Sequence, residues 1–414
     1  MKASDLHLKT LKEVPKDESA INAQLLIRAG FIEKLTSGVY NFLPLGLKVI
    51  YKIEDIIRTE MNNLGGEEIL MAALQPQKNW EQTKRWKTFN ALLKVKSQYE
   101  QWYALGPTHE EVVTPLAKQF VLSYKDLPLY LYQIQTKFRD EPRPKSGLLR
   151  TREFIMKDLY SFHRDEKDLD SYYEKVKKGY FKIYAQLELP VMMVEASGGT
   201  FSKYSHEFQT ITESGEDTIY HCSHCGFTQN AEIIENKKQC PHCKHQLEKL
   251  KGIEVGNIFK LKDKYAQPFG LTYIDFHGHK RIVMMGCYGL GVSRLMGALA
   301  EVSHDQHGLI WPAAVAPFKY YLLPVLSGDK KLDQSIKKAT TDLYQDLIKQ
   351  KVEVLYDDRQ DVSTGEKLND ADLLGVPYRL IISSRTIKNK SVEIKNRKTG
   401  LIKTIKIKTF LKNI

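Results

Sequence analysis

Hydrophobic residues recur at intervals of three and four positions in the first part of the chain, a spacing typical of an amphipathic helix. The members of this stripe are Ile50, Ile53, Ile57, Met61 and Leu64. Gly65 and Gly66 follow it and predict the end of the helix. Residues 68–74, Glu-Ile-Leu-Met-Ala-Ala-Leu, form an almost continuous apolar run, which predicts a buried strand.

A β-hairpin is predicted over residues 136–163, where a loop interrupted by proline and glycine separates two strand-like runs. Strand alternation turns Arg139 and Glu141 to one face, with Phe154 and Asp158 of the returning strand facing them. A cation, a carboxylate and an aromatic plane in this arrangement can together bind one nucleotide. The alternative is a basic surface hairpin with an ordinary ion pair.

Residues 105–111, Leu-Gly-Pro-Thr-His-Glu-Glu, predict a turn followed by a helix. Thr108 suits the N-cap position and Glu111 lies three residues on, so a capping box accounts for both. It does not account for His109 and Glu110, which are candidates for polar contacts inside a site.

A charged amphipathic helix is predicted over 166–190, ended by Pro190. Residues 191–212 predict a strand, a glycine-containing turn and a second strand, and His206 lies at the start of that second strand. A single histidine in such a place is more often a structural residue than a ligand.

Four of the five cysteines form two Cys-x2-Cys knuckles that are separated by 14 residues. They are Cys222, Cys225, Cys240 and Cys243. This pattern suits tetrahedral thiolate coordination of zinc, whereas disulfides are rare in the cytosol, so we predict a structural zinc ribbon. Four histidines flank the knuckles and can replace a cysteine as ligand: His221, His224, His242 and His245.

Strands are predicted at 252–261 and 281–285, followed by a helix that Gly289 and Gly291 open. Arg294 lies in the first turns of this helix, where the helix N-terminus and the guanidinium together favour an anion. The segment fails as a dinucleotide fingerprint, because the third glycine is missing and no alternating strand–helix unit precedes it.

Pro312 and Pro317 mark a linker to a compact α/β module. Its predicted elements are strands at 320–325, 352–356 and 378–383, helices at 333–350 and near 365–375, and two basic strand-like runs. From Arg379 to Ile414 there are eleven Lys and Arg residues and one acid, a net charge of +10. This charge suggests that the module binds a polyanion, most simply nucleic acid, although a solvated lysine-rich surface is the alternative.

The composition narrows the class of protein. At 414 residues with 42% hydrophobic content, the chain is expected to fold into two or three domains. No run of eighteen apolar residues occurs, and the N-terminus carries acids and lacks the apolar core of a signal peptide. We therefore expect a cytosolic protein without a membrane span.

Several motifs together resemble a known family. Phe138-Arg139-Asp140-Glu141, with Arg150, Phe154 and Asp158, resembles motif 2 of class II aminoacyl-tRNA synthetases, and residues 289–294 resemble motif 3. Longer strings are similar, in the same order, to bacterial-type prolyl-tRNA synthetases: LGPTHEEVVT (105–114), YQIQTKFRDE (132–141), REFIMKDLYSFH (152–163), SHEFQ (205–209), GIEVG (252–256) and CYGLGVSR (287–294). Residues 357–379 resemble the anticodon-binding domain of this group.

The resemblance implies an α+β architecture: a class II antiparallel-sheet catalytic domain, a small insertion in the form of a four-cysteine zinc ribbon, and a C-terminal α/β anticodon-binding domain. The implied limits are 1–219 and 251–312 for the two parts of the catalytic domain, 220–250 for the ribbon and 317–414 for the anticodon-binding domain.

The resemblance also implies roles in ATP binding. Arg139 holds the α-phosphate and the proline carboxylate, Glu141 accepts from the adenine amino group, and Phe154 stacks on the ring. Arg294 takes the γ-phosphate, with Mg²⁺ bridging the phosphates. The further residues implied at the ATP site are Arg150, Gly289 and Gly291.

For proline, the resemblance implies that Thr108 and Glu110 hold the amino group, and that His206 is a further contact. Cys287 is implied near the ring pocket, although it can equally be a small core residue. The residues implied in tRNA binding are Arg359, Lys367, Lys395 and Arg397.

The expected activity is ATP-dependent ligation of proline to tRNA(Pro) by a homodimer; the alternative is a synthetase paralogue that binds tRNA or an amino acid without charging it. Three departures from the family pattern are Ala72 in place of proline, Phe201 and Ser202 in place of paired glycines, and Asn257 in place of histidine. Between residues 165 and 286 there is no room for the large editing domain of many relatives, so we expect no hydrolysis of mischarged alanyl-tRNA by this chain.

Overall fold

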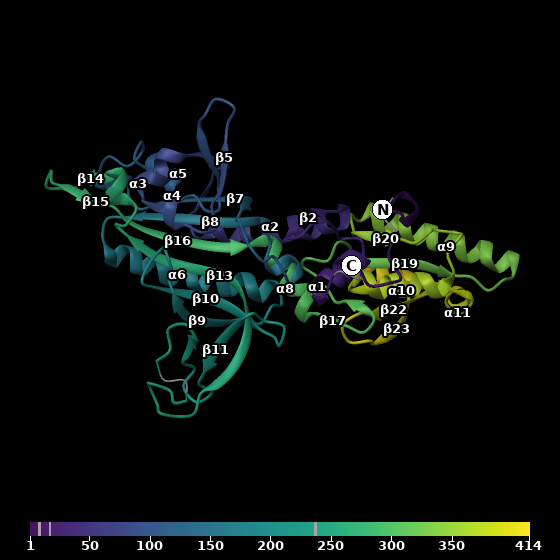
Figure 1. Cartoon of the computed structure of the whole chain (residues 1–414). Helices are drawn as coiled ribbons and strands as arrows, with labels where there is room; N and C mark the ends of the chain where they lie inside the picture. Colours follow the sequence, from purple (N-terminus) through teal and green to yellow (C-terminus); the bar gives the residue numbers. More distant parts are fainter. Residues whose placement is uncertain (7–9, 16–17, 236–237) are drawn as a thin grey trace. The chain divides into compact units, whose positions relative to one another are not determined.

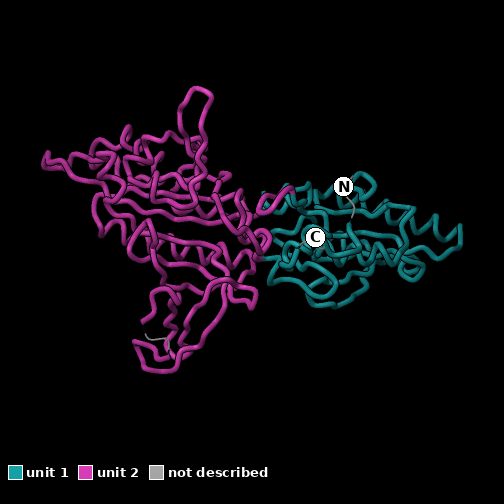
Figure 2. Tube along the Cα trace, in the orientation of Figure 1, with its two compact units in different colours: residues 1–34, 41–52, 299–414 teal, residues 35–40, 53–298 magenta. Residues whose placement is uncertain are grey.

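The computed structural model describes residues 1–6, 10–15, 18–235 and 238–414. They form two compact units, coloured separately in Figure 2. The smaller unit contains residues 1–34, 41–52 and 299–414, and the larger one contains residues 35–40 and 53–298. Four elements hold residues of both: β1 (Ile32–Thr36), β2 (Val39–Phe42), α2 (Pro44–Asn63) and α8 (Val292–Val302).

A nine-stranded, mostly antiparallel sheet forms the centre of the larger unit (Figure 1). In spatial order its strands are β10 (Tyr204–Ile211), β9 (Met192–Ser197), β12 (Thr228–Asn230), β11 (Asp217–His221), β13 (Glu248–Lys262), β16 (Met284–Gly291), β8 (Glu153–His163), β7 (Leu129–Phe138) and β3 (Glu67–Glu68). β10 pairs with β13 as well as with β9. The hairpin predicted over 136–163 is confirmed as β7 and β8, with Lys137 opposite Phe154.

Helix α6 (Glu166–Gln186) packs on one face of this sheet and confirms the helix predicted there. Its side chains Tyr172, Tyr173, Tyr180 and Tyr184 are buried. The Tyr173 hydroxyl donates to the carbonyl of Ile258 in β13 at 3.1 Å, so the helix is bound to the sheet by polar as well as aromatic contacts.

The remaining elements of the larger unit are short. Its further strands are β4 (Leu74–Pro76), β5 (Leu93–Lys96), β6 (Trp102–Leu105), β14 (Thr272–Ile274) and β15 (Lys280–Ile282). Its further helices are α3 (Gln77–Gln82), α4 (Arg85–Thr88), α5 (Glu110–Ala117), α7 (Ala266–Phe269), η2 (Tyr124–Asp126) and η3 (Gly147–Leu149).

The apolar stripe of α2 is confirmed, whereas the buried strand predicted over 68–74 is wrong. Only its two ends are strands, in β3 and β4, and Leu70 between them is 77% exposed. The segment is bound instead by single contacts to β7: Ile69 N donates to Tyr132 O, and Met71 N donates to the side chain of Gln133. Hydrophobic content alone therefore misled the prediction.

The smaller unit is an α/β module, as predicted. Its sheet has the order β20 (Val354–Tyr356), β19 (Tyr320–Val325), β21 (Tyr378–Ser383), β22 (Ser391–Asn396) and β23 (Ile402–Lys406). The first three strands are parallel, and β22 and β23 are antiparallel additions. Its other elements are η1 (Ala3–Asp5), α1 (Ile21–Arg28), β17 (His304–Asp305), β18 (Gly308–Leu309), α9 (Lys330–Lys349), α10 (Thr364–Leu374), α11 (Ser384–Lys388) and α12 (Ile407–Lys412).

The N-terminal residues belong to this smaller unit, which the limits implied from the sequence did not anticipate. The amino group of Met1 donates to Val354 O at 3.1 Å, and the Asn22 amide donates to Glu301 at 2.8 Å. These contacts join segments about 300 residues apart, which no local pattern reveals. Among the described residues, no helix combines the length and the apolar composition that a membrane span requires.

Candidate active site

Two adjoining cavities lie over β8, β13 and β16 in the larger unit. Arg139, Phe154, Glu254 and Arg294 line both of them. The first cavity, of about 210 Å³, extends to Glu141, Arg150, Glu216 and Asp217. The second, of about 270 Å³, extends to Thr108, Phe201, Asn257, Cys287, Gly289 and Gly291. The hairpin and the strand–helix turn that the sequence singled out therefore meet at one site.

Arg139 and Arg294 place two positive charges at the junction of the cavities. Burial, and after it the charge of Arg294, lower the pKa of Arg139 to about 10. The Nε atom of Arg139 is buried and has no hydrogen-bond partner among the described residues. Because Arg294 disfavours the charge of Arg139, an anion bound between the two guanidiniums is favourable.

Phe154 and Glu254 fix the positions of these arginines. The guanidinium of Arg139 lies 5.0 Å from the centre of the Phe154 ring. Arg294 donates from Nη1 to the carboxylate and to the carbonyl of Glu254, both at 3.1 Å. A side chain at Gly291 would place its Cβ 3.1 Å from Cβ of Arg294, so glycine leaves room for this arginine.

The first cavity is bordered by alternating charges. Arg150 donates to Glu141 at 3.0 Å and to Glu216 at 3.1 Å. Burial raises the pKa of Glu141, but hydrogen bonds from Arg150 and from the Arg143 amide outweigh it, so the pKa lies below its usual value. Glu141 is thus ionised at neutral pH and can accept from an amino group.

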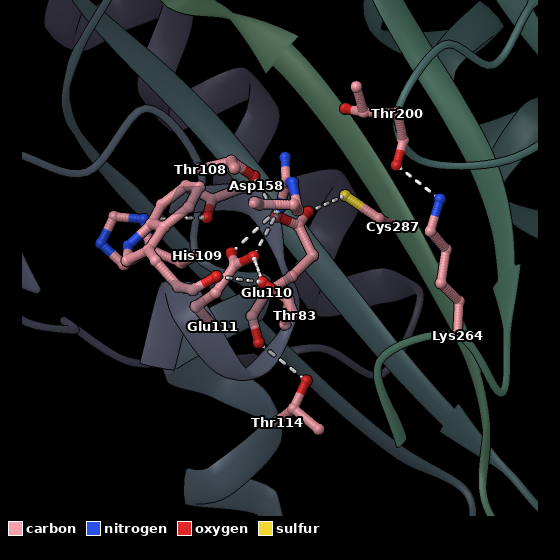
Figure 3. A network of polar contacts seen from close by, with 12 residues as sticks. Thr83, Thr108, His109, Glu110, Glu111, Thr114, Asp158, Thr200, Lys264 and Cys287 are labelled. Carbon is pink, nitrogen blue, oxygen red and sulfur yellow. Dashed lines mark hydrogen bonds and ion pairs between the residues drawn. The ribbon is translucent and has the colours of Figure 1, made fainter. Parts of the chain in front are cut away.

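Two side chains that line the second cavity, Thr108 and Cys287, both donate to a buried carboxylate behind them, that of Glu110. Thr108 Oγ1 donates to Glu110 Oε2 at 2.6 Å, and Cys287 Sγ donates to Glu110 Oε1 at 3.2 Å. Figure 3 shows these side chains converging from the 105–109 turn, α5 and β16. The structure brings Thr108, Glu110 and Cys287 together, as expected from the resemblance.

The capping box predicted from Thr108 and Glu111 is wrong. The N-cap residue of α5 is His109, and no side chain makes the capping hydrogen bond. Thr108 instead donates to Glu110, and the Glu111 carboxylate accepts hydrogen bonds from Arg85 and from Thr83. The hydroxyl of Thr108 therefore belongs to the cavity rather than to the helix terminus.

Behind the turn, His109 is bound in a buried charged network. Lys137 Nζ donates to His109 Nδ1 at 2.7 Å and pairs with Asp158 at 2.8 Å. Since Nδ1 accepts, Nε2 carries the proton and donates to the carbonyl of Ala72 at 3.2 Å. Asp158, expected beside the nucleotide, lies in this network instead, because the register sets it opposite Gln133 rather than Arg139.

His206 is not brought together with the other predicted proline contacts. It pairs across the sheet with Ile258, whereas its neighbour Glu207 pairs with Asn257, which lines the cavity. Adjacent strand residues point to opposite faces. His206 accordingly lies on the α6 side, where its Nδ1 is 2.7 Å from the Tyr173 hydroxyl.

The four ribbon cysteines converge as predicted. The Sγ atoms of Cys222, Cys225, Cys240 and Cys243 all lie within 4.8 Å of one another. The pairs Cys222–Cys243 and Cys225–Cys240 are 3.4 and 3.5 Å apart. His224 and His245 also lie near Cys243, but their rings stack in parallel at 3.8 Å, an arrangement that does not aim two ring nitrogens at one ion. The geometry favours four sulfurs.

The four residues expected to bind tRNA are all engaged within the smaller unit. Arg359 pairs with Asp357 and Asp370, and Lys367 is buried beside Asp357. Lys395 pairs with Asp372, and the buried Arg397 makes two 2.6 Å hydrogen bonds to Asp305. Their role in tRNA binding remains a prediction, and these ion pairs give each of them a structural role as well.

Sequence reasoning missed three residues around the cavities: Arg85, Phe201 as a wall, and Glu254. Glu254 lies inside the string GIEVG, and its position two residues from a cavity glycine was the available signal. Phe201 was noted only as a departure from paired glycines, and Arg85 gave no signal, because Glu110 and Phe201 lie far along the chain from it.

Comparisons with known proteins identify the domains that carry these residues. Residues 93–303 match the tRNA synthetase class II core domain (G, H, P, S and T), and residues 319–414 match the anticodon binding domain. A proline–tRNA ligase of Ehrlichia chaffeensis is 41% identical over 416 residues, covering 96% of each chain. A proline–tRNA ligase of Halothermothrix orenii is 34% identical over 566 aligned positions, covering 100% of this chain and 99% of its own.

The second of these alignments contains at least 152 positions without a residue of this chain, since 566 exceeds 414 by that number. Among solved structures, the Giardia lamblia prolyl-tRNA synthetase in complex with prolyl-adenylate matches with a TM-score of 0.80. It is 21% identical, and the match covers 94% of this chain and 74% of that one. At that identity the likeness concerns the fold.

Proposed function

This chain belongs to the proline–tRNA ligases, which are class II aminoacyl-tRNA synthetases, and from this premise we propose how its residues perform the reaction. The enzyme joins proline to tRNA with ATP, and it lacks the large insertion of longer relatives. Activation requires the proline carboxylate to attack the α-phosphate of ATP, which brings two anions together. The chain must therefore offset negative charge and fix both reactants in line.

Arg139 is the residue that serves both reactants. It lines both cavities, and this single observation carries the proposal. From the junction, its guanidinium holds the proline carboxylate and the α-phosphate, and it stabilises the charge that develops between them. Arg294 offsets the charge of the outer phosphates, so the catalytic contribution is position and electrostatics rather than a protein nucleophile.

The adenine and the phosphates of ATP occupy the first cavity in this proposal. Phe154 stacks on the base and the ionised Glu141 accepts from its amino group, while Arg150 fixes Glu141 from behind. Gly289 and Gly291 line the second cavity, which also contains Arg294, and they let the backbone of β16 approach the α-phosphate at the junction of the two cavities. Phe154 supports this arrangement because its ring already lies against Arg139.

Proline occupies the second cavity. Its protonated secondary amine donates to Thr108, which lines the cavity, and to the buried Glu110 carboxylate, which lies directly behind Thr108. Cys287 lies beside the ring of the substrate and supplies a small apolar surface. His206, on the α6 side of the sheet, acts at most through β10.

Mg²⁺ fits the donor set of the first cavity. Glu254 and Asp217 line it beside Arg294, and carboxylate oxygens are the ligands that Mg²⁺ prefers. Glu254 and Asp217 would hold the ion there, and it would supply charge neutralisation for the phosphates. Glu254 would hold it while keeping its contact with Arg294.

Zinc fits the four converging sulfurs of the ribbon, where it supplies structural cross-linking. Two further expectations follow from family membership. The chain acts as a homodimer, which the exposed Leu70 and Leu74 that follow α2 support, and the basic end of the smaller unit binds tRNA(Pro). A cytosolic site of action remains a prediction from the sequence.

The absence of the insertion leads us to propose that this enzyme does not edit. Alanine fits a proline cavity and loses only a few methylenes of contact, about 1–3 kcal/mol, so misactivation follows. Purified enzyme incubated with alanyl-tRNA carrying the proline anticodon should leave it intact. Deacylation faster than the rate without enzyme would reveal a hydrolytic site and refute this part.

The proposed roles are tested by substituting Glu110. Glu110→Gln keeps the shape but removes the charge that pairs with the substrate amine. The KM for proline in ATP–pyrophosphate exchange should rise at least ~10-fold, while the KM for ATP stays within about twofold. An unchanged KM for proline would remove Glu110 from the amino-acid site.

A further inference from the structure

We propose that Arg85, which lies outside both cavities, is a positioning residue that holds two groups at the amino-acid cavity: the Phe201 ring, which lines it, and the Glu110 carboxylate, which lies directly behind the lining residue Thr108. The inference rests on the proposed function, because it assigns the second cavity to the amino acid. Arg85 is 4% exposed and is absent from the residues that line either cavity. Its effect must therefore pass through its neighbours.

The Glu110 carboxylate is bound by charge. Nη1 of Arg85 lies 2.9 and 3.0 Å from the two carboxylate oxygens of Glu111, and 3.4 Å from Oε2 of Glu110. Both carboxylates are fully buried, and a buried carboxylate without a countercharge is costly. The same oxygen of Glu110 accepts from Thr108, so Arg85 and Thr108 together fix its direction.

The Phe201 ring is bound by aromatic contact. The guanidinium carbon of Arg85 lies 4.8 Å from the ring centre of Phe201, and Phe89, Trp80 and Tyr265 lie at 4.7, 5.1 and 5.5 Å. Nε and Nη2 of Arg85 have no hydrogen-bond partner within the described part of the chain. The cation is thus enclosed by ring faces, which is where cation–π attraction is strongest.

Phe201 reaches the cavity from the loop between β9 and β10. The loop between β9 and β10 is bound by the hydrogen bond from Phe201 N to Gly198 O and by Lys264, whose Nζ donates to Thr200 O at 2.6 Å (Figure 3). The Phe201 ring packs on Phe259, 4.8 Å away, and both line the cavity. Arg85 adds the contact that holds the ring inward.

Phe201 stands where the family pattern has glycine, so this wall is a feature of the chain at hand. Arg85 couples it to the group that binds the amine. Loss of the guanidinium leaves Glu110 and Glu111 facing each other without the cation that bridges them, and it releases the Phe201 ring. Proline binding should weaken, whereas the ATP cavity, which has no contact with Arg85 in the described residues, should keep its affinity.

The test is ATP–pyrophosphate exchange by the full-length enzyme with Arg85→Met, Arg85→Lys, Phe201→Leu and the double variant Arg85→Met/Phe201→Leu. Arg85→Met should raise the KM for proline about 10-fold or more, with the KM for ATP changed less than about twofold. Arg85→Lys restores the charge but not the planar contact with the rings, so it should recover part of the loss. Phe201→Leu should raise the KM for proline by a smaller factor in the Arg85→Met background than in the wild type, because the two residues act through one contact.

Arg379→Met is the matched control. Arg379 is another largely buried arginine that pairs with a carboxylate, Asp372 at 3.3 Å, but it lies in the smaller unit. The Arg379→Met substitution should lower the melting temperature and leave the KM for proline unchanged. The inference alone is overturned if the wild type is active and Arg85→Met has the same KM for proline as the wild type. It is also overturned if the KM for proline and the KM for ATP rise together in Arg85→Met.

Arg85→Lys keeps the experiment decisive if Arg85→Met fails to fold. The inference is also overturned if Arg85→Lys folds with a wild-type KM for proline and if Phe201→Leu changes that KM by the same factor in the Arg85→Lys variant as in the wild type. A wild type without proline-dependent exchange overturns the proposed function, and this inference with it.

Discussion

The buried His109 makes the stability of the larger unit depend on pH. Burial, and after it the charge of Lys137, lower the pKa of this histidine from 6.5 to about 4. Between these values the unfolded chain binds a proton that the folded chain does not, so stability falls as the pH decreases from about 6.5 to about 4. At about 1.4 kcal/mol for each pKa unit, the loss at the acid end is roughly 3 kcal/mol.

His109→Asn should remove most of this dependence. The asparagine oxygen can accept from Lys137 in place of Nδ1, but it does not titrate. The assay is urea unfolding from pH 7.5 to 4, followed by tryptophan fluorescence in a Trp311→Phe background. The chain has four tryptophans, and the three that remain, Trp80, Trp86 and Trp102, lie in the larger unit.

The quantity to compare is the difference in unfolding free energy between the two proteins at each pH, because the other titrating groups are common to both. We expect the wild type to lose roughly 3 kcal/mol relative to His109→Asn between pH 6.5 and 4. Parallel curves would mean that His109 is protonated as easily in the folded protein as in the unfolded chain. That result would refute the assigned direction of the Lys137–His109 hydrogen bond.

Three further predictions concern the cavities, the ribbon and the basic end. Arg139→Ala and Arg294→Ala should each lower exchange by roughly 10²-fold or more, with unchanged circular dichroism, and near wild-type exchange would remove that arginine from the mechanism. Metal analysis should find about one zinc per chain, lost in Cys222→Ser, and stable metal-free protein would contradict a structural ribbon. Neutralising the exposed Lys403, Lys406 and Lys408 should reduce the slope of tRNA affinity against salt concentration by about one for each lost phosphate contact, with exchange retained. Arg397→Met should instead lower stability, because it breaks the partly buried ion pair of Arg397 with Asp305.

Local patterns predicted the elements that local physics determines. The stripe of α2, the β7–β8 hairpin, α6 and the alternating elements of the smaller unit were all visible in the spacing of apolar residues. The apolar run at 68–74 failed, because hydrophobicity does not show whether a neighbouring strand is available to pair with it. The described fold of the smaller unit was predicted, but its N-terminal contribution was not, since those contacts are far apart in sequence.

The site shows the same limit. Arg139, Arg294, Thr108 and Glu110 were identified because they lie in distinctive strings, and the structure brings them to one place. The face of His206 depended on the register of β10 against β13, which alternation cannot supply. Arg85 carries no local signal, because its meaning comes from Glu110, 25 residues on, and from Phe201 on a distant loop.

The most direct test of the central claim is the exchange of labelled pyrophosphate into ATP by folded, zinc-loaded enzyme, measured with each of the common amino acids in turn. The account predicts exchange that depends on proline, slower exchange with alanine, and none above background with larger amino acids. Exchange should be lost in Arg139→Ala and should not require tRNA. Absence of proline-dependent exchange, or equal exchange with a different amino acid, would contradict the assignment of the cavities to ATP and proline.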